Sequence, residues 1–596
     1  MNASLASIGA KRESMSANGA PVQWFVPQLQ MFPLAARRCT VRNRLTGASL
    51  ELSSGEYAVL SACEGCRPLG EHEALAAQRL SAPHEHRSAI RELLERCARQ
   101  GLLISLPDLA ARFGPTGASN MPPLVDVAIP TADRPRLVLR LLTSAVALQR
   151  RTGAAYRWHV FDDSRSADNR RGVVEAIESC PDLEVSYHDL SAVDSLESRL
   201  AAAFPGVRRE IHSLLAAAAP GEITSGRTMN HELLWFAGRR FLSIDDDALL
   251  EPRRPPLERP GVQVGFSQPA AFWYDSLDAA YAACPELPLD PFVEHTQWLG
   301  LRMADAWRRA ATEGIHVREI PHWAAAYFDS AASVIFTANH LLGDPGWVSF
   351  SGQQLAIGAE TRAWLGANPE AVRHAFDSQI HWRGYTSLRL APQTGLSTTT
   401  LTGFDDRVLL PPAARAGFAT DTMIGELTRC IHPTGWASSL PFALPHLRDS
   451  RRRWLSPTEP PVFDRNRSLL ASYAHRSSLS IHACDPAARL ATLGEAFVDL
   501  GAASDATLHG VIEEHAADHA RQVAFRVNEQ LDDATTPEGW KQVLRQWVGS
   551  PLLRLDAEAL RQQRLPPDEL RTLARDFGRA LIAWPRLWAW CRENAQ

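Results

Sequence analysis

Three consecutive aspartates, Asp245, Asp246 and Asp247, give the clearest sign of chemistry in the sequence. They follow an apolar run at 241–244, which is typical of a strand buried in a sheet. Because side chains alternate along an extended chain, Asp245 and Asp247 are expected to face one site and Asp246 another. Carboxylates gathered at a strand end repel one another and favour a cation, and oxygen ligands suit Mg²⁺ or Mn²⁺. A solvated acidic turn is the alternative interpretation.

Two further sets of polar residues could bind a ligand. Asp162 and Asp163 end another apolar run and could accept hydrogen bonds from a base or a ribose, although they could equally cap the helix expected at 165–180. Arg227 and Asn230 lie near the start of a helix that precedes the aspartate strand. A guanidinium suits diphosphate oxygens, and an arginine on the surface is the alternative interpretation.

From residue 124 onward, apolar runs alternate with amphipathic segments. This alternation predicts an α/β domain in which a parallel sheet carries helices on both faces. In open sheets of this kind, ligands bind beyond the carboxyl ends of the strands, which is where the aspartates stand. Strands are expected at 124–131, 156–164, 183–190 and 239–252, and helices at 134–151, 169–180 and 229–238.

A chain of 596 residues is too long for a single core, and its pattern changes along its length. A turn-linked pair of short strands followed by helical segments predicts a small winged-helix-like α+β domain near the start. Helical periodicity dominates the last part of the chain. The expected segments are a flexible leader at 1–37, the winged-helix-like domain at 38–106, a linker at 107–122, the α/β domain at 123–456 and a helical domain at 457–596.

The composition is that of an ordinary globular protein without a dominant charge. A net charge of -5 gives no sign of a surface for nucleic acids or membranes, and no apolar run approaches the ~20 residues that span a bilayer. The scattered cysteines form no disulfide framework, which favours a cytoplasmic protein. Cys63 and Cys66 amount to half of a zinc site, so packing is the favoured interpretation for them.

The order and spacing of these motifs resemble the family-2-like glycosyltransferases of the GT-A fold, over about 124–450. The matching motifs are Ile129-Pro130-Thr131 with Arg134-Pro135, Asp162-Asp163, Arg227 with Asn230, and the aspartate triplet. The resemblance implies a nucleoside-diphosphate-sugar donor, UDP-linked by default, and a Mn²⁺ or Mg²⁺ ion held by Asp245 and Asp247. It also implies a set of residues that bind the nucleotide sugar, namely Pro130, Thr131, Arg134, Asp162, Asp163, Arg227, Asn230, Asp245 and Asp246.

The resemblance extends to a second segment, where a Leu-Pro-Pro turn at 410–412 precedes a helix start at Thr420-Asp421. Family members carry a Glu-Asp pair here, so Thr420 is a departure, while Asp421 is implied to be the general base that deprotonates the acceptor. Without the resemblance, Asp421 would be interpreted as a helix N-cap. A histidine often completes the metal site in this family, so His446 is the candidate and His432 the substitute. A packed or surface histidine is the alternative.

The stretches 52–80 and 90–105 resemble the PqqD-like recognition domains of peptide-modifying enzymes, which bind a leader peptide as an added strand. A DNA-binding winged helix would need a basic excess that this region lacks, and a purely structural module is the remaining alternative. We therefore expect an inverting glycosyltransferase that acts on a hydroxyl of a peptide or protein. The alternatives are an enzyme of cell-surface polysaccharide or lipid-linked glycan, and a non-catalytic nucleotide-binding scaffold.

Overall fold

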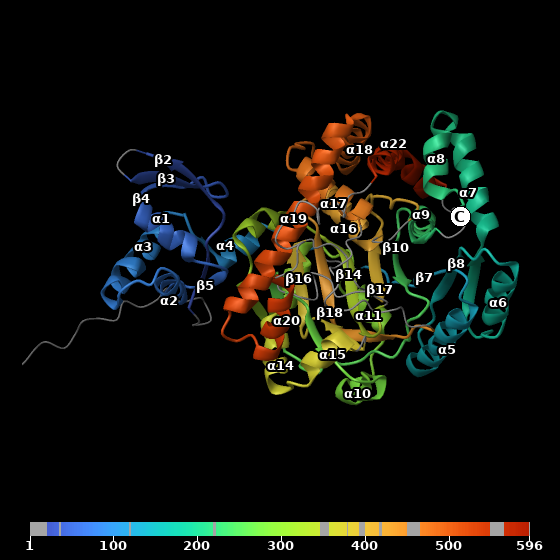
Figure 1. Cartoon of the computed structure of the whole chain (residues 1–596), viewed down its shortest axis with the longest axis horizontal. Helices are drawn as coiled ribbons and strands as arrows, with labels where there is room; N and C mark the ends of the chain where they lie inside the picture. Colours follow the sequence, from blue (N-terminus) through green and yellow to red (C-terminus); the bar gives the residue numbers. More distant parts are fainter. Residues whose placement is uncertain are drawn as a thin grey trace, which may run out of the picture.

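The computed structural model describes residues 21–34, 37–117, 121–217, 222–266, 268–345, 357–377, 380–392, 400–416, 420–449, 465–548 and 566–594. At its centre is a twelve-stranded sheet whose main path runs in the order β13-β11-β16-β18-β14-β17-β10-β7-β8-β9 (Figure 1). Its strands are β7 (Asp126–Thr131), β8 (Arg157–Asp162), β9 (Glu184–His188), β10 (Arg240–Ile244), β11 (Val262–Gly265), β12 (Ala270–Trp273), β13 (Ile315–Glu319), β14 (Val334–Gly343), β15 (His381–Gly384), β16 (Leu388–Pro392), β17 (Leu401–Asp405) and β18 (Trp436–His446).

The edge of the sheet formed by β9-β8-β7-β10 is parallel throughout, as the alternation of strands and helices predicts. The strands β8 and β9 follow β7 in the sequence and lie on one side of it in the sheet. The next strand, β10, lies on the other side of β7. The sheet therefore has a topological switch point between β7 and β10, where open α/β sheets bind their ligands. Beyond β10 the sheet is mixed, because β17 pairs antiparallel with both β10 and β14 while β14 and β18 are parallel.

Helices cover both faces of this parallel edge, and β7 shows how the sequence produces that arrangement. Val127 and Ile129 enter one hydrophobic cluster, whereas Ala128 between them enters another. A strand that buries both alternating sets of side chains must be apolar throughout, which explains the continuous apolar run. The helices around the sheet are α5 (Pro135–Thr152), α6 (Ala167–Glu178), α7 (Leu190–Ala203), α8 (Arg208–Leu215), α9 (Ser225–Trp235), α10 (Leu277–Ala283), α11 (Pro291–Thr296), α12 (Met303–Glu313), α14 (Ala359–Ala367), α15 (Ala371–Asp377) and α16 (Thr420–Ile431).

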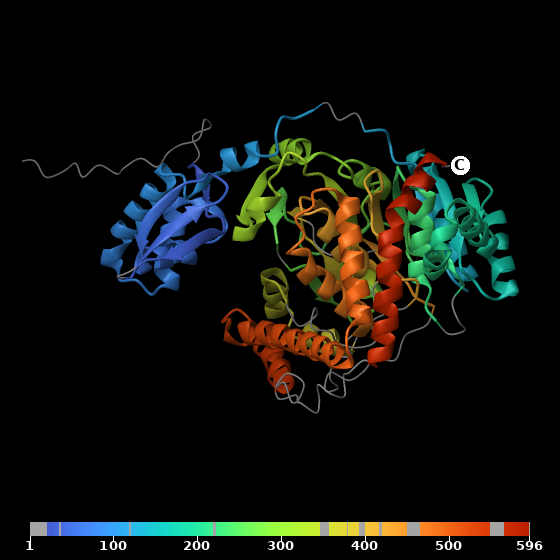
Figure 2. The ribbon, with the colours of Figure 1, turned by 90° about the horizontal axis from the view of Figure 1, so that it is seen from above.

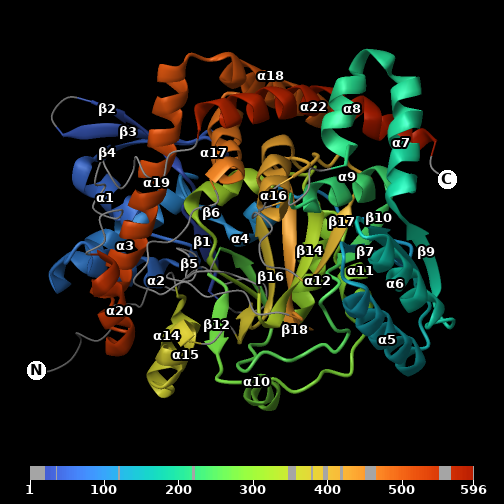
Figure 3. The ribbon, with the colours of Figure 1, turned by 45° about the vertical axis from the view of Figure 1, so that its right-hand side comes forward.

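The helices at the C-terminal end share a hydrophobic core with the sheet domain. They are α17 (Arg465–Ser478), α18 (Pro486–Ala502), α19 (Asp505–Asp532), α20 (Glu538–Val548) and α22 (Pro567–Glu593). Figure 3 shows α18 and α22 running side by side above the sheet, and one cluster joins their apolar residues to those of α9 and α16. Trp584 and Trp588 of α22 donate indole hydrogen bonds to the Leu410 carbonyl at 2.7 Å and to Asp406 at 2.8 Å. The boundary expected at 456/457 lies outside the described residues.

The N-terminal domain stands to one side of the sheet (Figure 2) and is larger than expected. The expected flexible leader at 1–37 is wrong in part, because residues 23–25 and 29–33 form strands whose backbone groups pair with the strands that follow. Two three-stranded sheets result, in the orders β5-β1-β6 and β2-β3-β4. The elements are β1 (Gln23–Phe25), β2 (Leu29–Pro33), β3 (Arg38–Asn43), β4 (Ser49–Ser53), α1 (Ser54–Ala62), β5 (Cys66–Pro68), α2 (Leu69–Arg79), α3 (Arg87–Arg99) and β6 (Ile104–Ser105).

The linker expected at 107–122 is also wrong in part. Leu106–Ala111 forms the helix α4, because Ser105 caps it and Pro107 takes its first turn, where a proline is tolerated. Phe113 then stacks on Phe328 with ring centroids 4.7 Å apart, so this end of the segment packs against the sheet domain.

Cys63 and Cys66 are both buried, and burial raises the pKa of Cys63 to about 12. Their thiols are therefore part of the packed interior, in agreement with the packing interpretation. Among the described residues, no helix is long and apolar enough to cross a membrane.

The contact between Trp588 and Asp406 predicts a measurable loss of stability. In Trp588→Phe the Asp406 carboxyl, which is 0% exposed, loses its indole donor, and we expect the free energy of unfolding to fall by about 1–3 kcal/mol. Urea unfolding measures this change. Trp590→Phe is the matched control, since Trp590 is only partly buried on the same helix. An equal loss in both variants would show that the Asp406 contact contributes nothing specific.

Candidate active site

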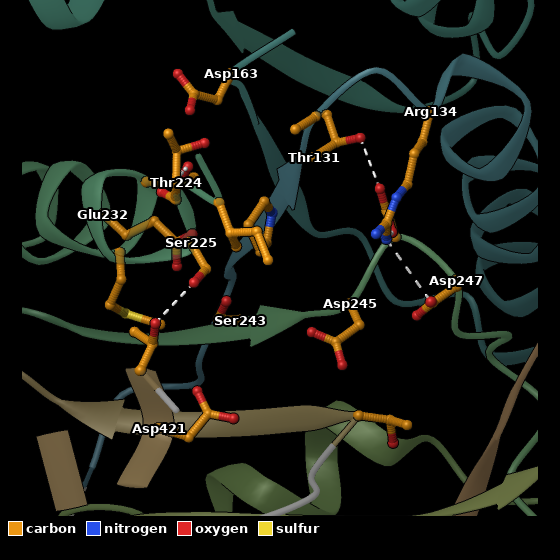
Figure 4. A pocket seen from close by; sticks show the side chains of 18 of the residues that line it. Thr131, Arg134, Asp163, Thr224, Ser225, Glu232, Ser243, Asp245, Asp247 and Asp421 are labelled. Atoms are coloured by element: carbon orange, nitrogen blue, oxygen red, sulfur yellow. Dashed lines mark hydrogen bonds and ion pairs between the residues drawn. The ribbon is translucent and has the colours of Figure 1, made fainter. Parts of the chain in front are cut away.

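A pocket of about 600 Å³ lies beyond the carboxyl ends of β7 and β10, at the switch point of the sheet (Figure 4). Its walls come from the β7–α5 turn, the end of β10, α9, β17, the first turn of α16 and the end of β18. The residues singled out in the sequence that line it are Pro130, Thr131, Arg134, Asp163, Asp245, Asp246, Asp247, Asp421 and His446.

Asp245, Asp247 and His446 converge in this pocket. His446 Nε2 lies 2.9 Å from Asp247 Oδ1 and 3.8 Å from Asp245 Oδ2. The imidazole is held in place because its Nδ1 donates to the Asp344 carbonyl at 2.6 Å. Gly343 permits the close strand pairing behind it, since a Cβ there would lie 2.4 Å from the His446 carbonyl oxygen. Within the described part of the chain, these three side chains form the one group able to hold a metal ion.

The charges in this cluster are strongly coupled. Burial would raise the pKa of Asp247, but His446, Arg134 and Arg448 lower it to about 2. Burial and the charge of Asp247 raise the pKa of Asp245 well above its usual value. Burial would lower the pKa of His446, but Asp247 and Asp245 raise it to about 9. The imidazolium of His446 therefore balances part of the charge of the two carboxylates, and the same oxygen and nitrogen donors fit Mn²⁺ or Mg²⁺.

Asp246 lines the same pocket, but its hydrogen-bond partners differ from those of this cluster. Thr131 donates to its Oδ2 at 2.7 Å and Arg134 to its Oδ1 at 3.0 Å. Burial raises the pKa of Asp246 and Arg134 opposes the rise, which leaves it at about 6. Asp133 has a left-handed backbone with φ +57, which turns the chain from β7 into α5. The Asp246 carboxyl thus fixes this turn to the end of β10.

Asp421 stands exposed in the first turn of α16 and borders the same pocket. Its charge raises the pKa of both Asp245 and Glu232, so its carboxylate lies within electrostatic reach of both. Figure 4 shows Asp421 and Asp245 between the side of the pocket that carries Glu232 and the side that carries Asp247. Thr420, the departure from the family pattern, shares a 2.7 Å hydrogen bond with the hydroxyl of Ser225.

Two expected site residues, Asp162 and His432, lie outside the pocket lining. Asp162 accepts a hydrogen bond from Tyr187 at 2.7 Å, which keeps its carboxylate at the strand end rather than in the pocket. His432 Nε2 is hydrogen-bonded to the Leu409 carbonyl at 2.7 Å. The structure thus brings His446, and not His432, to the aspartates.

Arg227 and Asn230 are buried beneath the pocket and do not line it. Arg227 is 1% exposed and pairs with Asp163, so its guanidinium meets a protein carboxylate where a diphosphate was expected. Asn230 donates to the Ala413 carbonyl at 2.9 Å and accepts from the Ala413 amide at 2.8 Å. Both residues position other groups: Arg227 holds Asp163, and Asn230 holds the segment that leads to α16.

The structure adds pocket residues that the sequence did not single out. Glu232 and Ser243 line its floor, and Arg448 lies 3.7 Å from Asp247. Glu232 follows several other polar residues of α9, so no signal in the sequence set it apart. The periodicity did not expose it, because α9 is buried on every side from Gly226 to Leu234.

No family model and no curated protein matches the sequence. Among solved structures, residues 1–349 of TarS from S. aureus match at 11% identity with a TM-score of 0.26, covering 74% of this chain and 92% of that chain. The mannosyltransferase PcManGT from Pyrobaculum calidifontis, in complex with GDP-Man and Mn²⁺, matches at 11% identity with a TM-score of 0.24, covering 80% and 92%. Because both TM-scores are low, the fold of this chain rests on its own strand order.

The coupling between His446 and the aspartates predicts how metal affinity depends on pH. A cation that binds Nε2 must displace a proton whose pKa is about 9. The Mn²⁺ affinity should therefore rise with pH, by close to tenfold per unit between about pH 6.5 and 8.5, and level off above pH 9. Calorimetric titration at several pH values measures this slope.

His446→Gln is the test variant for this dependence. Its Mn²⁺ affinity should be roughly 10- to 100-fold weaker and clearly less dependent on pH, because no imidazole proton is displaced. An unchanged slope in the variant would exclude His446 as a ligand.

Proposed function

We propose that this chain is a metal-dependent, inverting glycosyltransferase of the GT-A type that uses a nucleoside-diphosphate sugar. One observation carries the proposal: a group of Asp245, Asp247 and His446 that fits a divalent cation shares a pocket with the carboxylate of Asp421. That pocket lies at the switch point of a parallel sheet, where nucleotides bind in folds of this class.

The charged side of the pocket suits the diphosphate of a donor. Arg134 and Arg448 line it beside Asp247 and supply positive charge. When bound, a divalent cation at Asp245 and Asp247 would neutralise the charge that develops on the departing diphosphate. Thr131 and Asp163 border the same space from the ends of neighbouring strands, which supports the nucleoside being held there. We take UDP as the default nucleotide.

Asp421 is the proposed general base. It is exposed at the pocket, so an acceptor hydroxyl can approach it from solvent. Its carboxylate would take the hydroxyl proton while the oxygen attacks the anomeric carbon from the face opposite to the diphosphate. The C–O bond to the acceptor forms as the bond to the diphosphate breaks, which inverts the anomeric configuration.

The N-terminal domain supports a peptide or protein as the acceptor. Strand β2 lies at the edge of its sheet and exposes Met31 (44%) and Phe32 (48%). An edge strand with exposed apolar side chains can pair with an added peptide strand. The same domain contacts the sheet domain through Arg318, which pairs with Glu71 at 2.6 Å. A peptide bound at β2 would then be tethered to the body that carries the pocket.

Donor turnover tests the proposed activity. Wild type should release UDP or GDP from one member of a panel of sugar nucleotides with Mn²⁺, and EDTA should abolish the release. Asp247→Ala should lower the rate by roughly 100-fold or more, because it removes a metal ligand. Asp126→Asn is the matched control, since Asp126 is 5% exposed at the opposite end of β7. Binding of nucleotide without turnover by any donor would favour the non-catalytic scaffold.

The proposed base gives a second, separable prediction. Asp421→Asn should lower kcat by about 10²–10⁴-fold, because proton removal in the transition state is lost, while the Kd for the nucleoside diphosphate changes little. Steady-state kinetics and equilibrium titration measure the two effects. Asp568→Asn is the control, since Asp568 is also an exposed aspartate in the first turn of a helix. A kcat within about threefold of wild type would remove Asp421 from the mechanism.

A further inference from the structure

The two sides of the pocket differ in chemistry. One side carries the aspartates of the cation cluster and the arginines beside it. The other side carries hydroxyl groups and one buried carboxyl, from α9, β10, β17 and α16. These residues are Thr224, Ser225, Glu232, Ser243, Thr402 and Thr420. Figure 4 shows Thr224, Ser225 and Glu232 on this side, opposite Arg134 and Asp247.

Glu232 is the unusual member of the hydroxyl-rich side. Its side chain is 0% exposed, yet within the described part of the chain neither carboxyl oxygen accepts a well-formed hydrogen bond, and the nearby Ser243 hydroxyl interacts with it only weakly. Ser243 lies close enough to favour the ionised form, but burial and the charge of Asp421 raise the pKa of Glu232 to about 8. Burying a carboxyl without partners costs about 1–3 kcal/mol or more. A ligand that enters the pocket would offset this cost.

The position of Glu232 indicates which part of a substrate reaches it. Glu232 is fully buried whereas Asp421 is exposed, and Ser243 lies on β10 two residues before Asp245. An acceptor reaches Asp421 from solvent without passing Glu232. The pocket continues past Asp421 and Asp245 to the enclosed side that carries Glu232, away from Asp247 (Figure 4), and this space is left for the group that is transferred.

Building on the proposed function, we infer that Glu232 and Ser243 form the subsite for the transferred sugar, in which the Glu232 carboxyl is hydrogen-bonded to a sugar hydroxyl. A carboxyl group and a hydroxyl can together donate to and accept from a polyol. The neighbouring threonine and serine hydroxyls extend the same polar surface. Glu232 is therefore a binding residue that selects the sugar, distinct from the groups that bind the nucleotide and the cation.

The test compares affinities for a nucleotide with and without its sugar. Calorimetric titration with Mn²⁺ gives the Kd of wild type for UDP, GDP, UDP-glucose, UDP-N-acetylglucosamine and GDP-mannose. Glu232→Leu should weaken binding of the preferred sugar nucleotide by about tenfold, through loss of a hydrogen bond, and leave the Kd for the matching nucleoside diphosphate within about twofold. Glu232→Gln, which keeps a donor and an acceptor, should restore most of the affinity.

Stability provides an independent readout, because Glu232→Leu removes an unpartnered buried carboxyl and should raise the melting temperature. Glu294→Leu is the control, since Glu294 is a partly buried glutamate whose pKa burial also raises and which lies outside the pocket lining. Equal changes for the sugar nucleotide and the nucleoside diphosphate, or no change for either, would overturn the subsite. Should wild type bind neither UDP nor GDP, the proposed function would fail and the subsite with it.

Discussion

The mutual repulsion of carboxylates at the end of β10 is the constraint on which the site depends. Asp245, Asp246 and Asp247 are consecutive, and Asp421 is brought close by another element. The fold compensates each carboxylate differently: Asp246 by Arg134 and a hydroxyl, and Asp247 by a protonated imidazole. Asp245 has only His446 opposite it, at 3.8 Å, and burial and the charge of Asp247 raise its pKa well above its usual value. A divalent cation would relieve the remaining repulsion between the carboxylates. The residues that hold the aspartates together therefore also favour the binding of a metal ion.

The described segment that leads toward α16 and Asp421 is held from two sides. From below, Asn230 of α9 is hydrogen-bonded to both backbone groups of Ala413. From above, Trp584 and Trp588 of α22 reach the start of the same segment. The C-terminal helices therefore support the pocket from outside, since none of their described residues lines it. Their shared core with α9 and α16 explains why they pack onto the sheet domain and do not form a separate body.

The sequence predicted the parallel edge of the sheet because burial of β7, β8 and β10 leaves continuous apolar runs that end in polar residues. It also indicated Asp245 and Asp247 as a pair facing one site, whereas His446 was implied only by the family resemblance, with His432 as the substitute. It could not separate pocket residues from the residues that support them. Arg227 and Asn230 carry the polar groups expected of a ligand site, but both point into backbone and carboxyl partners from distant segments. Only the tertiary contacts of α9 reveal that difference.

Glu232 is the converse case, a pocket residue that the sequence did not identify. Helix periodicity identifies a polar face by its contrast with an apolar one, and α9 has no exposed face over Gly226–Leu234. The sequence pattern therefore does not distinguish Glu232 from the other polar residues of α9. In the structure, its carboxyl is enclosed beside Ser243 and Asp421. The physical cost of leaving it unpartnered is what marks it as functional. A buried polar group without an internal partner is thus the signal that the sequence conceals and that the folded chain makes visible.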